Sequence, residues 1–297
     1  MSKKIEVLWS GGWDSTFMLL KLAREYDVIQ PYYILFNRPG QEHELEAIRK
    51  ISERIKAQEE IKCNILPVIY VKKEDILEPL WLRRCWEKYK DEPYAVASQY
   101  LTLAAFAMQH KGIAVGQERY YETPGQMTRL MYEKGHMRFT RDGVGYFDKS
   151  GCQKDVYALF GNAVYPVALF SELMMKEKAE EWGWQDIMGH SWFCYYPVYG
   201  KPCGLCGPCR VKIRQRMDFL FSEDNLKAGM VFNYINANNL RDRYGQPLNA
   251  AFEEYVRVYK SGRWESGGFL HMDFNSVTNF AIFDEFLGNP KYWRRDP

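Results

Sequence analysis

Residues 9–16 read WSGGWDST, and the residue types in this stretch suit the binding of a phosphate group. They follow a short apolar run and precede a helical pattern, so they predict a turn between a strand and a helix. Such a turn presents backbone N–H groups and the positive end of the helix to an anion, and Ser10, Ser15 and Thr16 add hydroxyl donors. Asp14 would repel a triphosphate on its own, so we expect Mg²⁺ between its carboxylate and the phosphate oxygens.

Two widespread nucleotide-binding motifs do not fit this stretch. The loop GxxxxGK followed by Ser or Thr needs a lysine that is missing here, and the spacing differs from the GxGxxG turn. A plain tight turn, with glycines at positive φ and Asp14 as a helix cap, is the alternative interpretation. The stretch ESGGFL at 265–270 also contains SGG but lacks the Asp-Ser pair and the strand–turn–helix pattern, so SGG alone predicts little.

Four of the seven cysteines are spaced as C-x8-C-x2-C-x2-C, at Cys194, Cys203, Cys206 and Cys209. Four thiolates complete a tetrahedral zinc site, and because protein fills all four positions such a site is structural. An iron–sulfur cluster, a redox dithiol or unligated buried thiols are the alternatives, since two-residue spacings do not exclude iron. The remaining cysteines stand alone and are expected to be buried: Cys63, Cys85 and Cys152.

The composition is that of a folded protein: of 297 residues, 46% are hydrophobic and 26% are charged. No run approaches the ~18 apolar residues of a membrane helix, and the N-terminus lacks a signal-peptide pattern, so we expect a cytoplasmic location and no membrane partner. Clustered cysteines fit a reducing compartment. The net charge of +2 does not favour a nucleic-acid partner.

Hydrophobic periodicity predicts alternating strands and helices. Strands are expected at 4–9, 28–37, 63–71 and 113–117, and helices between them at 13–26, 44–57 and 94–112. This alternation predicts an α/β fold, a parallel Rossmann-like sheet with helices on both faces. Ligands of such sheets bind beyond the carboxyl ends of the strands.

The rest of the chain predicts less. Residues 118–162 are polar and glycine-punctuated and suggest a long loop or lid with a short hairpin, and 164–183 predict another strand and helix. We expect three parts: an α/β domain with the phosphate-binding turn at 1–189, a four-cysteine zinc module packed on it at 190–217, and a C-terminal extension at 218–297. Aromatic residues of the extension are expected in a core or at a homodimer surface.

The stretch SGGxDS after the first strand resembles the signature of the PP-loop ATP pyrophosphatases, which cleave ATP between the α and β phosphates and transfer AMP to a substrate oxygen. Together with the later SWFCYY and CGLCGPCRVKIR, it resembles the 7-cyano-7-deazaguanine synthase (QueC-like) family over roughly residues 4–217.

This resemblance implies an adenine nucleotide α hydrolase-like fold with zinc in the cysteine knot and ATP and Mg²⁺ as cofactors. It implies Ser10, Asp14 and Ser15 as catalytic residues. It also implies a larger set of nucleotide-binding residues: Ser10, Gly11, Gly12, Asp14, Ser15, Thr16 and Gly116.

The chain departs from the family in segments that help form the pocket for the deazaguanine acid. It reads EPYAVASQY before the fourth strand and QERYYETPGQM after it, and the family's Ser-Lys before the late helix is Ser171 and Glu172. Four residues are weaker candidates for substrate contacts, because each also has a purely structural interpretation: Gln41, His43, Tyr120 and Tyr121.

These observations favour ATP-dependent adenylation of a carboxylate, followed by amidation with ammonia or another amine. The resemblance implies that the carboxylate is 7-carboxy-7-deazaguanine and that the product is its amide or nitrile. A second hypothesis joins the activated acid to an amine on a protein or other macromolecule, as in relatives from antiphage defence operons. Other PP-loop chemistry such as tRNA thiolation, and a nucleotide-binding module without turnover, complete the alternatives.

Overall fold

The computed structural model describes residues 2–119, 126–197, 200–241, 245–256 and 278–293. The chain divides into two compact units, of which unit 1 comprises residues 1–37 and 41–192 and unit 2 comprises 38–40 and 193–297. Unit 2 holds the four cysteines and the C-terminal segment together.

Unit 1 is built on a six-stranded sheet in which every described pair of strands is parallel. Its strands are β1 (Lys4–Leu8), β2 (Val28–Leu35), β3 (Asn64–Ile65), β4 (Ile69–Lys72), β5 (Ile113–Val115) and β8 (Ala163–Val164). The spatial order is β3-β2-β1-β5-β8, and β4 pairs with β2. The predicted parallel α/β fold is therefore confirmed.

Strand β1 lies where the order of the strands reverses. Leu8 of β1 pairs with Tyr32 of β2 on one side and with Val115 of β5 on the other. At such a switch point the connections leave toward opposite faces, and a crevice opens between the carboxyl ends of the two strands. The turn at residues 9–16 follows β1 at this crevice.

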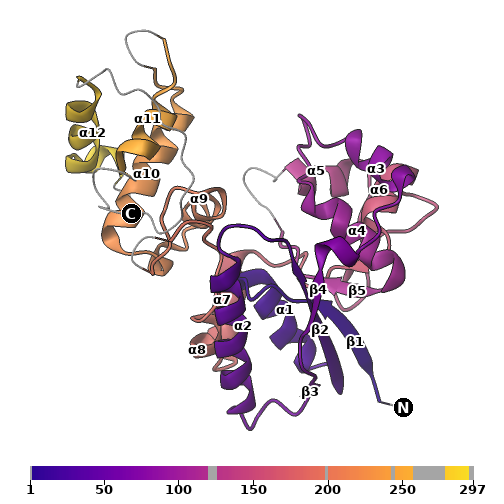
Figure 1. Cartoon of the computed structure of the whole chain (residues 1–297). Coiled ribbons are helices and arrows are strands. Elements are labelled where there is room, and N and C mark those ends of the chain that lie inside the picture. Colours follow the sequence, from indigo (N-terminus) through magenta and orange to yellow (C-terminus); the bar gives the residue numbers. More distant parts are fainter. Residues whose placement is uncertain (1, 120–125, 198–199, 242–244, 257–277, 294–297) are drawn as a thin grey trace. The chain divides into compact units, whose positions relative to one another are not determined.

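Helices cover both faces of the sheet (Figure 1). One layer consists of α1 (Trp13–Ala23), α2 (Gln41–Lys56), α7 (Glu172–Glu181) and α8 (Gln185–Met188). The other consists of α3 (Leu80–Glu87), α4 (Gln99–Gln109), α5 (Gln126–Glu133) and α6 (Lys154–Phe160). Leu8, Tyr32 and Ile34 of the sheet share a core cluster with this second layer.

The sequence explains why the two helices nearest the crevice differ. In α1 nearly every residue is buried, because its apolar residues surround the helix. In α2 the buried aliphatic residues Ile48, Ile51 and Ile55 recur every three or four positions and form one stripe. Helix α1 is therefore enclosed by its neighbours, whereas α2 covers it from outside.

Three predicted segments differ from the structure. The strand predicted at 63–71 is split into β3 and β4 by Pro67, which has no N–H for a continuous ladder. The helix predicted from residue 94 begins at Gln99, after a turn in which Ala95 has a positive φ. Within 118–162 the predicted hairpin is present as β6 (Arg138–Phe139) and β7 (Gly145–Tyr146), but α5 and α6 were not predicted.

The described part of unit 2 is helical. Its helices are α9 (Gly207–Arg214), α10 (Glu223–Ala237), α11 (Leu248–Tyr255) and α12 (Thr278–Gly288). Helix α10 packs against α9, α11 and α12, so the cysteine segment and the C-terminal segment share one core. In neither unit does a described helix combine the length and the apolar character that crossing a bilayer requires.

Candidate functional site

The turn at residues 9–16 joins the end of β1 to the N-terminus of α1, as predicted. Gly11 has a φ of 70°, and a Cβ there would lie 3.0 Å from both the carbonyl oxygen of Glu44 and Cγ1 of Ile48. Glycine is the residue that tolerates both constraints. Gly12 is the N-cap of α1. The first turn of a helix presents backbone N–H groups and the positive end of the helix dipole, and both suit an anion.

Ser10 and Ser15 form a small hydrogen-bond network inside the turn. Their hydroxyl oxygens are 3.1 Å apart, and the Ser15 hydroxyl donates to the Gly12 carbonyl at 3.2 Å. The N–H groups of Ser10 and Gly12 donate to the Ser15 and Ser10 hydroxyls at 3.2 and 3.3 Å. O–H···O bonds are most favourable near about 2.7 Å, so phosphate oxygens can replace these long bonds at small cost.

Thr16 has a different environment from the two serines. It is fully buried, its hydroxyl accepts a hydrogen bond of 3.1 Å from the Trp9 indole, and its N–H donates to the Gly12 carbonyl at 2.9 Å. The Thr16 side chain thus ties the first turn of α1 to the end of β1.

Gly116 lies directly against the backbone of this turn. A Cβ at Gly116 would be 2.8 Å from the nitrogen and Cα of Ser15 and 3.0 Å from the carbonyl carbon of Asp14. The segment after β5 therefore crosses the N-terminus of α1 at backbone contact. The resemblance implies that Gly116 binds nucleotide, and in the structure the close approach of Gly116 is to α1.

Three carboxylates from separate elements converge beside the turn. Asp14 lies in the first turn of α1, Glu118 follows β5, and Glu172 is the first residue of α7. One oxygen from each lies within 4.8 Å of the others, and Glu118 and Glu172 are only 8% and 1% exposed. A divalent cation would relieve the repulsion between such close negative charges, and carboxylate oxygens are ligands that Mg²⁺ prefers.

The sequence predicts Asp14 but not the two glutamates as members of this cluster. In the sequence, Glu172 stands out only as a departure from the Ser-Lys of the resembled family, and no motif includes Glu118. A signal is nevertheless present, because both follow strands of a parallel sheet, whose carboxyl ends meet at one edge. Ser171 caps α7 by accepting a hydrogen bond of 3.2 Å from the Met174 N–H, and this cap places Glu172 at the start of the helix.

The weaker substrate candidates have structural contacts or lie outside the described residues. Gln41 accepts a hydrogen bond of 2.9 Å from the Asn37 N–H, which closes the turn before α2. His43 stacks on Trp192 with ring centroids 4.7 Å apart, and the Trp192 N–H donates to the Gly11 carbonyl at 2.9 Å. His43 therefore supports the segment that lies against the turn at residues 9–16. Tyr120 and Tyr121 lie outside the described residues.

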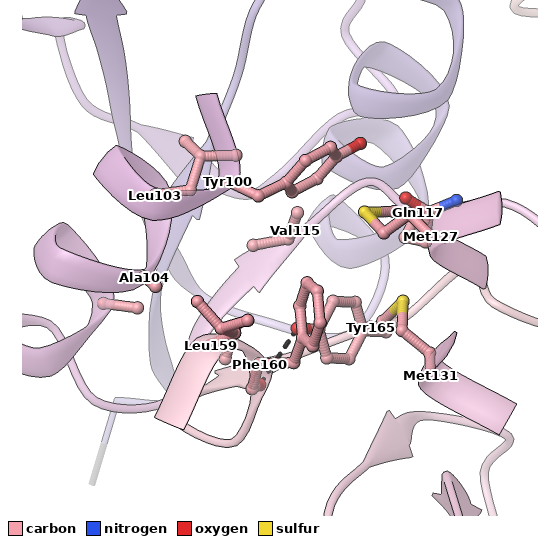
Figure 2. Close-up of a pocket in the computed structure, with 12 residues that line it drawn as sticks. Tyr100, Leu103, Ala104, Val115, Gln117, Met127, Met131, Leu159, Phe160 and Tyr165 are labelled. Carbon is pink, nitrogen blue, oxygen red and sulfur yellow. Dashed lines mark hydrogen bonds between the residues drawn. The ribbon is translucent and has the colours of Figure 1, made fainter. Parts of the chain in front are cut away.

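An apolar pocket opens at the carboxyl end of β5, among α4, α5 and α6 (Figure 2). Its cavity volume is about 20 Å³, which is room for about one water molecule. Most of its wall is aliphatic or aromatic, and Gln117 contributes an amide.

The four cysteines of unit 2 come together as predicted. They are all buried, and their sulfur atoms all lie within 4.8 Å of one another. Three pairs are separated by 3.3, 3.8 and 3.9 Å. A tetrahedron with Zn–S bonds of about 2.3 Å has an edge of about 3.8 Å, so the sulfur spacing fits a single zinc ion.

Backbone N–H groups surround these sulfurs. The Cys203 N–H donates to Cys194 Sγ at 3.2 Å, and the Leu205 and Cys206 N–H groups donate to Cys203 Sγ at 3.4 and 3.3 Å. Such donors stabilise thiolates and orient metal ligands. The spacing of the cysteines does not predict these contacts, because they depend on the fold of the turn at 203–206.

Two of the other three cysteines, Cys85 and Cys152, are buried as the sequence predicted, whereas Cys63 is only half-buried. Burial raises the pKa of each thiol to about 11. They are therefore protonated near neutral pH and poorly suited to act as nucleophiles.

Comparisons with known proteins add distant likenesses. No family model matches the chain. It is similar to a predicted subunit of tRNA methyltransferase from Methanocaldococcus jannaschii, with 14% identity over 72% of this chain and 88% of that chain and a TM-score of 0.35. It is also similar to the U34-tRNA thiolase NcsA from Methanococcus maripaludis, described with its 4Fe–4S cluster, with 13% identity over 97% and 82% of the two chains and a TM-score of 0.36. Likenesses this distant carry no argument about what the chain binds or transforms.

Proposed function

We propose that this chain is a PP-loop enzyme that uses ATP to adenylate a carboxylic acid and then transfers the acyl group to an amine. The observation that carries the proposal is the arrangement at the β1–α1 turn, where the N-terminus of α1 and two serine hydroxyls lie beside three converging carboxylates. Phosphate groups and a divalent cation are the ligands that suit these two neighbouring features.

The turn holds the phosphates of ATP. The N–H groups of the first turn of α1 and the hydroxyls of Ser10 and Ser15 donate to phosphate oxygens, which replace the long bonds within the turn. Donors fixed in the scaffold stabilise charge that develops on the leaving pyrophosphate, because they need no reorganisation during the reaction. No protein nucleophile is required.

Magnesium fits the donor set of Asp14, Glu118 and Glu172, because all three side chains offer oxygen atoms from within one small volume. When bound, the ion supplies positive charge that offsets both the carboxylates and the phosphates. Asp14 is the member of this set nearest in sequence to the phosphate-binding serines, so it links the two sites.

The reaction balances without a redox partner. A carboxylate oxygen of the substrate attacks the α-phosphorus of ATP, the bond to the β-phosphate oxygen breaks, and pyrophosphate leaves. The acyl-adenylate then loses AMP to an attacking amine, which releases a proton and forms an amide. Adenylation is needed because a free carboxylate is a poor acylating agent, whereas AMP is a good leaving group.

For the substrate we propose 7-carboxy-7-deazaguanine, with ammonia or another amine as acceptor. The support is the resemblance of SGGxDS and the cysteine segment to the 7-cyano-7-deazaguanine synthase family. Zinc in the four-cysteine cluster would then be structural, since four thiolates leave no position for substrate.

Hydroxylamine trapping tests the proposal whichever amine is the natural acceptor, because hydroxylamine itself attacks an acyl-adenylate. Purified protein is mixed with ATP, Mg²⁺, 7-carboxy-7-deazaguanine and hydroxylamine, and the products are separated by liquid chromatography with mass detection. We expect AMP, pyrophosphate and the acid's hydroxamate in equal amounts. Repeating the reaction with ammonia in place of hydroxylamine then tests for the amide or nitrile.

Matched variants show whether the proposed site is responsible. Asp14→Asn should lower hydroxamate formation at least a hundredfold, because the ligand nearest the phosphates loses its charge. Asp142→Asn removes an exposed carboxylate outside the site and should retain activity. ADP as the sole nucleotide product, or equal activity of the two variants, would contradict the proposal.

A further inference from the structure

Residue 192 is bonded to the turn at residues 9–16 through backbone atoms. The Trp192 N–H donates to the Gly11 carbonyl at 2.9 Å. A Cβ at Gly12 would lie 3.5 Å from the Trp192 carbonyl oxygen, so the backbone of residue 192 lies close to both glycines. Contacts that fix Trp192 therefore also act on the conformation of this turn.

The bond from Trp192 sets which way the Gly11–Gly12 peptide faces. In a trans peptide the C=O and the N–H point in opposite directions. With its carbonyl on Trp192, the peptide directs the Gly12 N–H to the other side, where it donates to the Ser10 hydroxyl at 3.3 Å. The Ser10 hydroxyl lies 3.1 Å from that of Ser15, so the Gly12 N–H points at the two hydroxyls that we propose bind phosphate.

Two adjacent glycines make this peptide easy to reverse. Gly11 has a φ of 70°, and glycine populates positive and negative φ almost equally. A reversed peptide would withdraw the Gly12 N–H and present the Gly11 carbonyl oxygen, whose partial negative charge repels phosphate. Reversal would also break the hydrogen bond from Trp192. That bond therefore favours the orientation that suits an anion.

Helix α2 supplies the support for Trp192. His43 of α2 stacks on Trp192 with ring centroids 4.7 Å apart and planes 23° from parallel. The next residue, Glu44, is buried, and its carboxylate accepts a hydrogen bond of 2.6 Å from the Tyr33 hydroxyl of β2. This bond fixes the start of α2 on the sheet. The His43 ring is therefore carried by a helix that is itself held in place.

We propose that His43 and Trp192 are positioning residues for the phosphates of ATP. Their stacked rings keep the Trp192 N–H on the Gly11 carbonyl, and that bond keeps the Gly12 N–H directed at the anion. The proposal rests on the proposed function and adds to it two residues outside the turn. It requires of His43 a flat ring and not its nitrogen atoms, and it gives His43 no contact with the acid.

Calorimetric binding of two anions to the full chain with its zinc tests this assignment. The probes are Mg²⁺–ATP and Mg²⁺–tripolyphosphate, which carries the phosphates without the nucleoside. His43→Ala should weaken binding of both about tenfold, because the Gly12 N–H contributes a hydrogen bond to a charged group. His43→Phe keeps a flat ring and should bind both within twofold of the wild type. Trp192→Leu should weaken both as His43→Ala does, and the double variant should weaken them no further.

Nuclear magnetic resonance with ¹⁵N-labelled glycine observes the Gly12 N–H directly. Its signal is the one that Gly12→Ala lacks, and tripolyphosphate should shift this signal in the wild type and in His43→Phe. In His43→Ala the signal should differ from that of the wild type before any anion is added, because the peptide is no longer held in one orientation.

His110→Ala is the matched control. His110 also stacks on an aromatic ring, that of Phe106, with centroids 4.1 Å apart, but it precedes β5 and so lies away from the carboxyl ends of the strands. This variant should bind both anions as the wild type does. Circular dichroism identifies a variant that fails to fold, and if His43→Ala does so, His43→Leu, which also lacks a flat ring, replaces it.

The outcomes separate this proposal from the proposed function. Wild-type affinity in folded His43→Ala, or equal losses in His43→Phe and His43→Ala, would overturn the positioning role alone. Weaker binding of ATP with unchanged binding of tripolyphosphate would also overturn it, because His43 would then act on the nucleoside. A wild type that binds both anions but forms no AMP would overturn the proposed function alone, and one that binds neither anion would overturn both.

Discussion

Replacing Gly116 by alanine tests whether the segment after β5 holds the turn at residues 9–16 in place. The added Cβ would lie 2.8 Å from two backbone atoms of Ser15. Carbon atoms in favourable contact are about 3.5 Å apart or more, so the two segments must separate by about 0.7 Å. Neither contact is the end of a flexible side chain, so the backbone itself must move.

The expected cost follows from this displacement. Overpacking of a well-packed site typically costs about 1–3 kcal/mol, and a loss of about 2 kcal/mol lowers the melting temperature of a unit of this size by about 4–8 °C. Moving Ser15 and Asp14 relative to Glu118 also spreads the carboxylate cluster. We expect AMP formation to fall by about tenfold to a hundredfold, because misplacement on the scale of 1 Å is costly in catalysis.

Thermal unfolding and product formation measure the two effects. Gly151→Ala is the matched control, because a Cβ at Gly151 meets only the end of the Arg138 side chain, at 3.4 Å. It should leave both measurements close to those of the wild type. If Gly116→Ala melts and reacts like Gly151→Ala, the inferred coupling between the β5 segment and the phosphate-binding turn is wrong.

Three other predictions concern the carboxylates and the thiols. Glu172→Gln should raise the Mg²⁺ concentration needed for half-maximal AMP formation at least fivefold, whereas the exposed control Glu59→Gln should not. The same half-maximal Mg²⁺ concentration in both variants would show that Glu172 does not bind the metal. Cys209→Ser should reduce bound zinc, measured by atomic emission, from about one ion per chain to near zero, whereas the control Cys152→Ser should keep its zinc. Full retention of zinc by Cys209→Ser would refute the four-cysteine site. In the zinc-bound protein, Cys63, Cys85 and Cys152 should react slowly with Ellman's reagent at pH 8, because burial raises the pKa of each thiol to about 11. Their reaction rate should rise about tenfold per pH unit up to about pH 11. A fast reaction whose rate does not depend on pH would contradict this assignment.

Much of the fold was predictable because its signals are local. The β-branched run before Ser10 and the regular spacing of Ile48, Ile51 and Ile55 indicate a strand and a helix without reference to the rest of the chain. Helices α5 and α6 were missed because they are short and lie among polar and glycine-rich residues. Packing on a common core stabilises such helices more than their intrinsic propensity does.

The candidate site likewise combines features that local spacing predicts with contacts that only the fold creates. Gly11, Gly12 and Asp14 are consecutive or nearly so, and the four cysteines lie within 16 residues, so their chemistry can be recognised from spacing. The segment at Gly116 is recognisable only as the end of a strand. Its contact with Ser15 depends on the pairing of β1 with β5, which are about a hundred residues apart in the chain.

By itself the sequence determined the strand–turn–helix at residues 9–16, the cysteine cluster and the parallel α/β pattern, since each depends on residue types at short and regular spacing. Only the tertiary structure decided that Glu118 and Glu172 join Asp14 and that Gln117 faces an apolar pocket. The reason is geometric: the order of the strands sets which carboxyl ends are neighbours, and the turn after β5, closed by the Gln117 N–H donating to the Val115 carbonyl at 2.9 Å, sets where the following side chains lie. Neither property can be read from any one segment alone.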